Sequence, residues 1–310
     1  MNFLKLIRFQ NLLIIALVQA VFHFGFLKQQ KGLLLALNTV EFIILITATL
    51  CIAASGYIIN NIVDQETDSI SKPDKVIVGK HISEKKAYNY YILLNTIGVM
   101  LGFFIANIIF KESFAGIFIV VAFVLYLYAT QFKQSLLAGN FLVSFLVAFS
   151  ILLVGLFDLY PIITPETKPF LNILFRIIID YAIFAFLITF IREIIKDIED
   201  YEGDFKTGMN TLPIVLGKEK TQKVVFGLSF IPLIALLYYL NENFTNLEYV
   251  IYYTLLFVVA PMLYSIVKIW QAKSQHDFNH VSLVLKLIMI TGILSVVVIT
   301  YNLNLIQKIG

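Results

Sequence analysis

Hydrophobic residues in this sequence gather into long runs that contain few charges. A helix needs about 20 apolar residues to cross a bilayer core of roughly 30 Å. The runs lack the alternation of apolar and polar positions that the strands of a membrane barrel show, which favours helices. We therefore predict membrane-spanning helices at about residues 11–27, 41–60, 89–109, 115–132, 136–157, 172–192, 224–240, 249–268 and 282–301.

The composition strengthens this interpretation. Of the 310 residues, 59% are hydrophobic and 14% are charged, and the mean hydropathy is +0.87. A soluble domain has about 45–50% apolar and about 25% charged residues, so one soluble core cannot absorb the excess. This excludes an ordinary soluble enzyme and a disordered chain. We expect an all-α, polytopic membrane protein of about nine helices, with residues 1–310 forming a single integral-membrane domain.

Charge and cysteine content exclude further classes. The single cysteine, Cys51, cannot close an internal disulfide, which excludes a disulfide-stapled secreted scaffold. The net charge of +3 is too small to indicate a nucleic-acid partner. With the N-terminus placed inside, the inner segments hold roughly three times as many Lys and Arg residues as the outer ones. We therefore expect the inner, cytoplasmic membrane, with the N-terminus on the cytoplasmic side and the C-terminus outside.

Two polar loops on the predicted cytoplasmic side, at about 60–88 and 192–223, contain most of the acidic residues. In the first loop, Asn60, Asp64 and Asp68 follow one another at intervals of four. On a helix that continues out of the second span, these three residues lie on one face. The second loop has a similar acidic face, formed by Glu193, Asp197, Asp200 and Asp204.

The two acidic faces correspond at a fixed distance along the chain. Asp200 follows Asp64 by 136 residues, and Asp204 follows Asp68 by the same number. This spacing indicates a weak internal repeat that places the two faces opposite each other across a pocket. Carboxylates near a hydrocarbon boundary are costly unless they are paired or bind a cation. Because oxygen-only ligands suit Mg²⁺ or Mn²⁺, the pattern predicts divalent metal ions that bridge a diphosphate.

The acidic loops are also compatible with a solvated surface and with a transporter of divalent cations. An acidic helix end beside lysines is often only a solvated loop, but two such motifs in register favour a site. A cation transporter predicts ionisable residues deep within the spans. Most acids here lie at span ends, which disfavours transport.

At these residues the sequence resembles the UbiA superfamily of intramembrane prenyltransferases. The family pattern NxxxDxxxD is matched by Asn60, Asp64 and Asp68. The chain departs from the family at Asn61, where Asp is common, and at Val76, where Pro is frequent. The resemblance implies a helical bundle with a central cavity.

Additional segments carry the same resemblance. Residues 192–217 resemble the pattern REIxKDIEDxEGDxxxGxxTLPxxxG, and this loop is most similar to the archaeal geranylgeranylglyceryl-phosphate geranylgeranyltransferase, or digeranylgeranylglyceryl phosphate synthase, branch. Residues 128–133, followed by Gly139 and Asn140, resemble a YSxxLK…GN region. Arg8 and Asn11 resemble an N-terminal RxxN motif.

The resemblance implies an enzyme that transfers a polyprenyl group, geranylgeranyl for this branch, from its diphosphate to a lipid acceptor with Mg²⁺ as cofactor. The implied acceptor is the hydroxyl of a prenylglyceryl phosphate, and an aromatic acceptor in quinone biosynthesis is the alternative. The implied metal ligands are Asn60, Asp64, Asp68, Asp197, Asp200 and Asp204. Asp64, Asp68, Asp200, Asp204 and Lys133 are the implied catalytic residues.

Cationic side chains are expected to complete the diphosphate site. The candidates are Lys72, Lys75, Lys133, Arg192, Lys196 and Lys206.

The spans themselves offer fewer candidates. Three aromatic residues of the fourth span, Phe123, Tyr126 and Tyr128, are candidates to face an allylic cation. Lys286, within the last span, is expected to extend its charge toward the membrane surface.

Overall fold

The computed structural model describes residues 2–71 and 76–309, so Lys72 and Lys75 lie outside the described residues. Within this part of the chain there is no strand, and Val78 and Ile82 form only an isolated bridge. The α-helices are α1 (Asn2–Leu6), α2 (Phe9–Ala20), α3 (Thr39–Val63), α4 (Gln65–Ser71), α5 (Glu84–Ile108), α6 (Ala115–Thr130), α7 (Ala138–Asp158), α8 (Lys168–Glu199), α9 (Tyr201–Lys206), α10 (Leu212–Leu216), α11 (Lys218–Leu228), α12 (Phe230–Asn243), α13 (Glu248–Thr254), α14 (Ala260–Gln271) and α15 (Gln275–Ile309). Short 3₁₀ or π turns are η1 (Val21–Phe26), η2 (Leu27–Gln29), η4 (Glu112–Phe114), η5 (Phe132–Gln134), η6 (Tyr160–Ile162) and η7 (Leu255–Val259).

Nine helical segments of the described chain are long and apolar enough to cross a membrane. This confirms the predicted all-α membrane fold. The sixth span differs from its prediction, because helix α8 runs over Lys168–Glu199 and is longer at both ends. The first half of the second acidic motif is therefore helix rather than loop. The seventh span is divided into α11 and α12 at Ser229.

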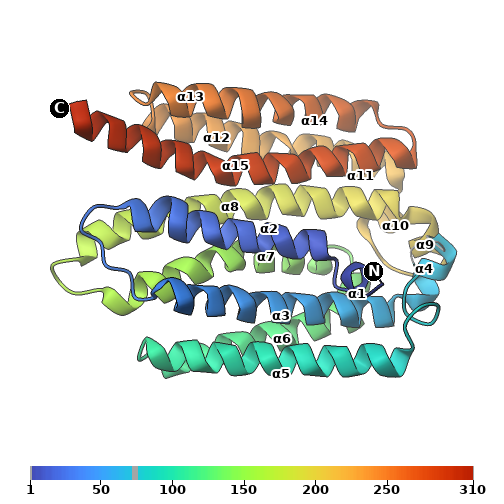
Figure 1. The fold of residues 1–310 in the computed structure, drawn as a ribbon. Helices are drawn as coiled ribbons and strands as arrows, with labels where there is room; N and C mark the ends of the chain where they lie inside the picture. The colour runs from blue at the N-terminus through green and yellow to red at the C-terminus, as the bar shows by residue number, and fades with distance from the viewer. Residues whose placement is uncertain (1, 72–75, 310) are drawn as a thin grey trace.

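Helix α8 lies at the centre of the bundle. Figure 1 shows it between the C-terminal helices α11–α15 and the N-terminal group that contains α2, α3 and α7. It packs against α7 on one side and α15 on the other. The short helices α4, α9 and α10 gather at one end of the bundle, as Figure 1 also shows. The same end therefore receives both acidic motifs.

Local sequence explains how the second span begins. The Asn38 side chain accepts hydrogen bonds from the backbone N–H groups of Val40 and Glu41 at 2.9 and 3.0 Å. In return, the Glu41 carboxylate accepts a bond of 2.8 Å from the Asn38 backbone. This reciprocal capping box satisfies N–H groups that have no partner within the helix. It fixes the start of α3 at the end of the bundle opposite the acidic motifs.

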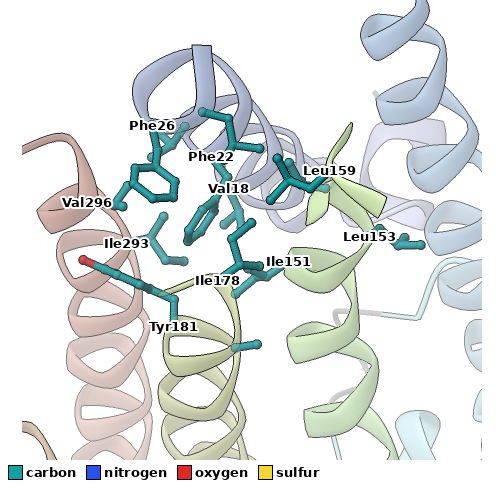
Figure 2. Close-up of a cluster of buried hydrophobic side chains, with 14 of the residues drawn as sticks. Val18, Phe22, Phe26, Ile151, Leu153, Leu159, Ile178, Tyr181, Ile293 and Val296 are labelled. Carbon is teal, nitrogen blue, oxygen red and sulfur yellow. The ribbon is translucent and has the colours of Figure 1, made fainter. Parts of the chain in front are cut away.

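Among the described residues, one of three buried hydrophobic clusters extends toward that opposite end and joins helices that are far apart in sequence. Figure 2 shows Phe22 and Phe26 of η1 among side chains of α7, α8 and α15, including Ile151, Tyr181 and Val296. The phenol of Tyr181 is hydrogen-bonded to the Ser295 hydroxyl at 2.6 Å. Because lipid chains are as apolar as these residues, close packing and interhelical hydrogen bonds hold such helices together.

A glycine permits close contact between α5 and α6 in the N-terminal half. A Cβ added at Gly102 of α5 would lie 2.2 Å from the ring of Phe118 in α6. Phe118 is only 2% exposed, so its ring has little room to move. Gly116 offers a matched control, because a Cβ there meets nothing within 4 Å.

We predict that Gly102→Ala lowers the stability of the detergent-solubilised protein by about 1–3 kcal/mol, because it overpacks this contact. Gly116→Ala is expected to be neutral or stabilising by up to about 1 kcal/mol, because alanine is the better helix former. Thermal unfolding followed by circular dichroism measures both. Equal melting temperatures for the two variants would contradict the proposed role of Gly102.

Candidate active site

Each acidic motif contains a joint, meaning one aspartate with non-helical torsions between two consecutive helices. Helix α3 ends at Val63, and Asp64 follows with φ −80° and ψ 2° before α4 begins. Helix α8 ends at Glu199, and Asp200 follows with φ −92° and ψ 4° before α9 begins. The two joints are 136 residues apart. The repeat seen in the sequence is therefore also a repeat of the same backbone break.

Backbone hydrogen bonds continue across each joint. The N–H of Asp64 donates to the carbonyl of Asn60 at 2.9 Å, and that of Asp68 donates to Asp64 at 2.8 Å. In the second motif, the N–H groups of Asp200 and Asp204 make the corresponding bonds at 2.8 and 3.1 Å. The helical register therefore survives, although the single continuous helix expected for the first motif is wrong. The non-helical torsions of the joint divide it into two helices.

The two motifs meet, because α4 packs against α9 at the end of the bundle where Figure 1 places both. Their charges influence each other. The pKa of the Asp204 carboxyl is raised to about 6, first by burial and then by the negative charges of Asp200 and Asp64, against the opposing effects of Lys133 and Thr211. Asp64 belongs to the first motif, so the two motifs share one electrostatic environment.

Lys133 links the connection between α6 and α7 to the first motif. Its ammonium group forms an ion pair with Asp64, which also accepts a hydrogen bond of 2.6 Å from the Asn60 amide. The backbone N–H of Asn210 donates to the carbonyl of Gln134 at 3.0 Å and so ties the second loop to the same connection. Segments of the chain near residues 60, 133 and 204 therefore meet in one place.

Glycine is required for this close approach. A Cβ at Gly139 would lie 2.8 Å from the backbone carbonyl oxygen of Phe132. A larger residue would push away the turn that holds Lys133.

Two polar residues position carboxylates of the second motif. The amide of Asn140 donates to Asp197 at 2.7 Å, and the hydroxyl of Thr211 donates to Asp204 at 3.2 Å. Asn140 and Thr211 both lie in segments that resemble the family. Their positions in the sequence, however, do not reveal which carboxylates they contact. The contact from Asn140 spans 57 residues of sequence.

The remaining predicted cations have different positions. Arg192 and Lys196 both contact Glu193, at 3.1 and 2.6 Å, within helix α8, eight and four positions before the joint residue Asp200. Lys206 is exposed in the last turn of α9. Among the predicted diphosphate-binding cations that the structure describes, Lys133 is the one in an ion pair with a motif aspartate.

A large cavity opens beside the joints between α2, α3, α6, α7, α8 and α15. Its space, including the open mouth, is about 1580 Å³. Most of its wall is apolar, and Asn60 and Tyr128 lie on the wall at the end near the motifs. Tyr128 is the one of the three aromatic candidates that lines it, because Phe123 and Tyr126 are exposed on the outer surface. Its charged lining residues are Arg8, Arg192, Glu193, Lys196 and Lys286.

Lys286 corrects one expectation. The residue does not extend toward the membrane surface. Its ammonium group donates to the Asn11 side chain at 2.9 Å, and both residues line the cavity.

The residues fit magnesium bound together with a phosphate-bearing substrate. Within residues 2–71 and 76–309, no group of three His, Cys, Asp or Glu side chains is close enough to hold a metal ion by itself. Mg²⁺ typically takes only one or two carboxylates and completes its shell with water and substrate phosphates. The buried side-chain oxygen of Asn60 has no hydrogen-bond partner and so retains capacity for a ligand. The donor set contains only oxygen at the two joints, which suits Mg²⁺.

Comparison with known proteins agrees with this arrangement. The model of the UbiA prenyltransferase family matches residues 21–290. A digeranylgeranylglyceryl phosphate synthase from Methanosphaera stadtmanae is 32% identical over 259 residues, which cover 81% of this chain and 86% of that protein.

Solved structures show the same fold. A structure described for a digeranylgeranylglyceryl phosphate synthase in membranes superposes with a TM-score of 0.64 and 25% identity over 96% of each chain. A UbiA homologue from Archaeoglobus fulgidus, bound to geranyl diphosphate (GPP) and Mg²⁺, superposes with a TM-score of 0.63 and 18% identity, covering 96% of this chain and 99% of that one. The chain is an integral membrane protein that belongs to the UbiA prenyltransferase family.

Proposed function

We propose that this prenyltransferase moves a geranylgeranyl group from its diphosphate to the hydroxyl of a prenylglyceryl phosphate. The observation that carries the proposal is the meeting of two carboxylate joints beside an apolar cavity. The cavity suits a long isoprenoid chain, and the joints suit the diphosphate end of the same molecule. The activity for which the relative from Methanosphaera stadtmanae is named supports the acceptor.

The reaction breaks the bond between C1 of the allylic group and the diphosphate oxygen, and the electron pair leaves with diphosphate. A bond then forms between C1 and the acceptor oxygen, whose proton passes to the released diphosphate. The apolar wall keeps water away from the reactive carbon. Tyr128, on the cavity wall near Asn60, presents an aromatic side chain to the positive charge that develops on the allylic group.

Magnesium supplies positive charge that stabilises the departing diphosphate. We assign Asn60, Asp64 and Asp68 to one ion and Asp197, Asp200 and Asp204 to the other. Asn140 and Thr211 hold Asp197 and Asp204 in place through hydrogen bonds of 2.7 and 3.2 Å. The ion pair of Lys133 with Asp64 supports assigning this lysine to contact with a diphosphate bound between the joints.

The excess of Lys and Arg in the inner segments supports a cytoplasmic position for the motif end of the bundle. We therefore propose that the diphosphate substrate enters from the cytoplasm, while both prenyl chains reach the cavity from the surrounding lipid. The membrane concerned is the cell's inner, cytoplasmic membrane.

We predict that Asp64→Asn and Asp200→Asn each lower the rate of geranylgeranyl transfer by about 100-fold or more, because each removes a charge that stabilises the leaving group. The measurement is transfer of radiolabelled geranylgeranyl from its diphosphate to geranylgeranylglyceryl phosphate. Glu66→Gln is the matched control, since Glu66 lies between Asp64 and Asp68 in the sequence but is exposed. Full activity in both aspartate variants would refute the assigned roles.

Removal of divalent metal is expected to abolish transfer, and added Mg²⁺ is expected to restore it.

The variant Asn140→Ala is expected to need about 10–100-fold more Mg²⁺ for half-maximal rate, because the variant leaves Asp197 without its positioning hydrogen bond. Magnesium titrations of the purified enzyme test both statements. Transfer that persists in excess chelator would contradict the metal requirement.

A further inference from the structure

One set of charges on the cavity wall has no role in the chemistry at the joints. The wall has four cations, Arg8, Arg192, Lys196 and Lys286, and one carboxylate, Glu193. Its net charge is therefore +3. Uncompensated cations beside a hydrocarbon interior are costly and generally indicate a binding or transport role.

The contacts of these side chains leave the charge largely unbalanced. Glu193 accepts from both Arg192, at 3.1 Å, and Lys196, at 2.6 Å. Lys286 donates to the neutral amide oxygen of Asn11 at 2.9 Å. The guanidinium of Arg8 lies 5.3 Å from the centre of the Tyr57 ring. Glu193 is thus shared by two cations, while the other two have neutral partners in these contacts.

Three segments that are remote in sequence hold the cations together. Arg192 of α8 donates through Nε to the backbone carbonyl of Ser282 in α15, at 3.2 Å. Lys286, also in α15, donates to Asn11 of α2. The bonds fix the cationic side chains on one wall of the cavity.

The depth of this wall separates it from the diphosphate site. Arg192 precedes the assigned metal ligand Asp197 by five positions and the joint residue Asp200 by eight, which corresponds to roughly 8 and 12 Å along the axis of α8. Arg192 therefore lies on the membrane side of these carboxylates, and Lys196, one position before Asp197, lies at the boundary between the two regions. The deeper cations therefore face a different part of the reactants.

The chemistry of the reaction places a second anion there. The prenyl chain extends from the diphosphate into the cavity, so its reactive C1 lies on the membrane side of the joints. The acceptor hydroxyl must approach C1, and in a prenylglyceryl phosphate the phosphate is separated from that hydroxyl by only a few bonds. An acceptor poised for transfer thus carries its phosphate toward the cationic wall.

We infer that Arg8, Arg192, Lys196 and Lys286 form the binding site for the acceptor's phosphate, separate from the metal-bound diphosphate. Arginine and lysine are well suited to phosphate, through charge-assisted hydrogen bonds. The inference rests on the proposed function and reassigns Arg192 and Lys196 from the donor to the acceptor. It also gives a reason for selecting a phosphorylated lipid over a neutral one.

Lys286→Met tests the assignment, because methionine keeps most of the length of the side chain without its charge, and nearby Met289 already lines the cavity. The expected result is a KM for geranylgeranylglyceryl phosphate that rises about 10-fold or more, which is the loss of one charge-assisted bond. The KM for geranylgeranyl diphosphate is expected to stay within about twofold, which also shows that the variant is folded. Lys286→Arg is expected to retain most of the acceptor affinity.

A second acceptor and a control make the test specific. The wild-type preference for geranylgeranylglyceryl phosphate over unphosphorylated geranylgeranylglycerol is expected to shrink in Lys286→Met by the same factor as the acceptor affinity. Lys223→Met is the control, because Lys223 is exposed and pairs with Glu219 outside the cavity.

The outcomes that overturn the inference differ from those that overturn the proposed function. A rise in the KM for the diphosphate substrate with an unchanged acceptor KM would assign the cluster to the donor. An unchanged KM for both substrates would remove the cluster from substrate binding. Wild-type enzyme that prenylates only an aromatic acceptor would overturn the proposed function itself, and the phosphate site with it.

Discussion

Repulsion among carboxylates at one end of the bundle is the constraint on which the site depends. Each of two helices ends immediately before an aspartate, and each resumes as a short helix that carries a second one. Because α4 and α9 pack together, negative charge accumulates where the two joints meet. The raised pKa of Asp204, about 6, reflects burial together with that accumulated charge. Lys133 offsets part of it through Asp64, and the proposed magnesium ions would offset the remainder.

The same constraint explains how the interior is divided. Negative groups lie at the joints, the cations of the cavity lie deeper on the wall formed by α2, α8 and α15, and the remaining wall is mainly apolar. In the proposed reaction, a metal-bound diphosphate, an acceptor phosphate and two isoprenoid chains would each occupy a region of matching chemistry. Such a separation would let two anionic substrates bind together, with the reactive carbon between their charged groups.

The sequence predicted the fold and the two motifs, because both follow from short-range patterns. Runs of apolar residues specified the spans, and the offset of 136 residues specified the two corresponding acidic motifs. The break at Asp64 was missed, since regular spacing of polar residues cannot distinguish a continuous helix from two helices in register. The partners of Asn140 and Lys286 were also missed, because these contacts join segments 57 and 275 residues apart. Only the packing of the helices brings such segments together, and no local pattern encodes it.

The most direct test of the shared site is a structure of the protein with Mn²⁺ and a geranylgeranyl thiodiphosphate that reacts slowly. Manganese takes the same oxygen ligands as magnesium and is located by its anomalous scattering. The account predicts one ion bound by Asp64 and Asp68, a second bound by Asp200 and Asp204, and the diphosphate between them. Metal peaks outside the joints, or a diphosphate bound at Arg192 and Lys286, would contradict it.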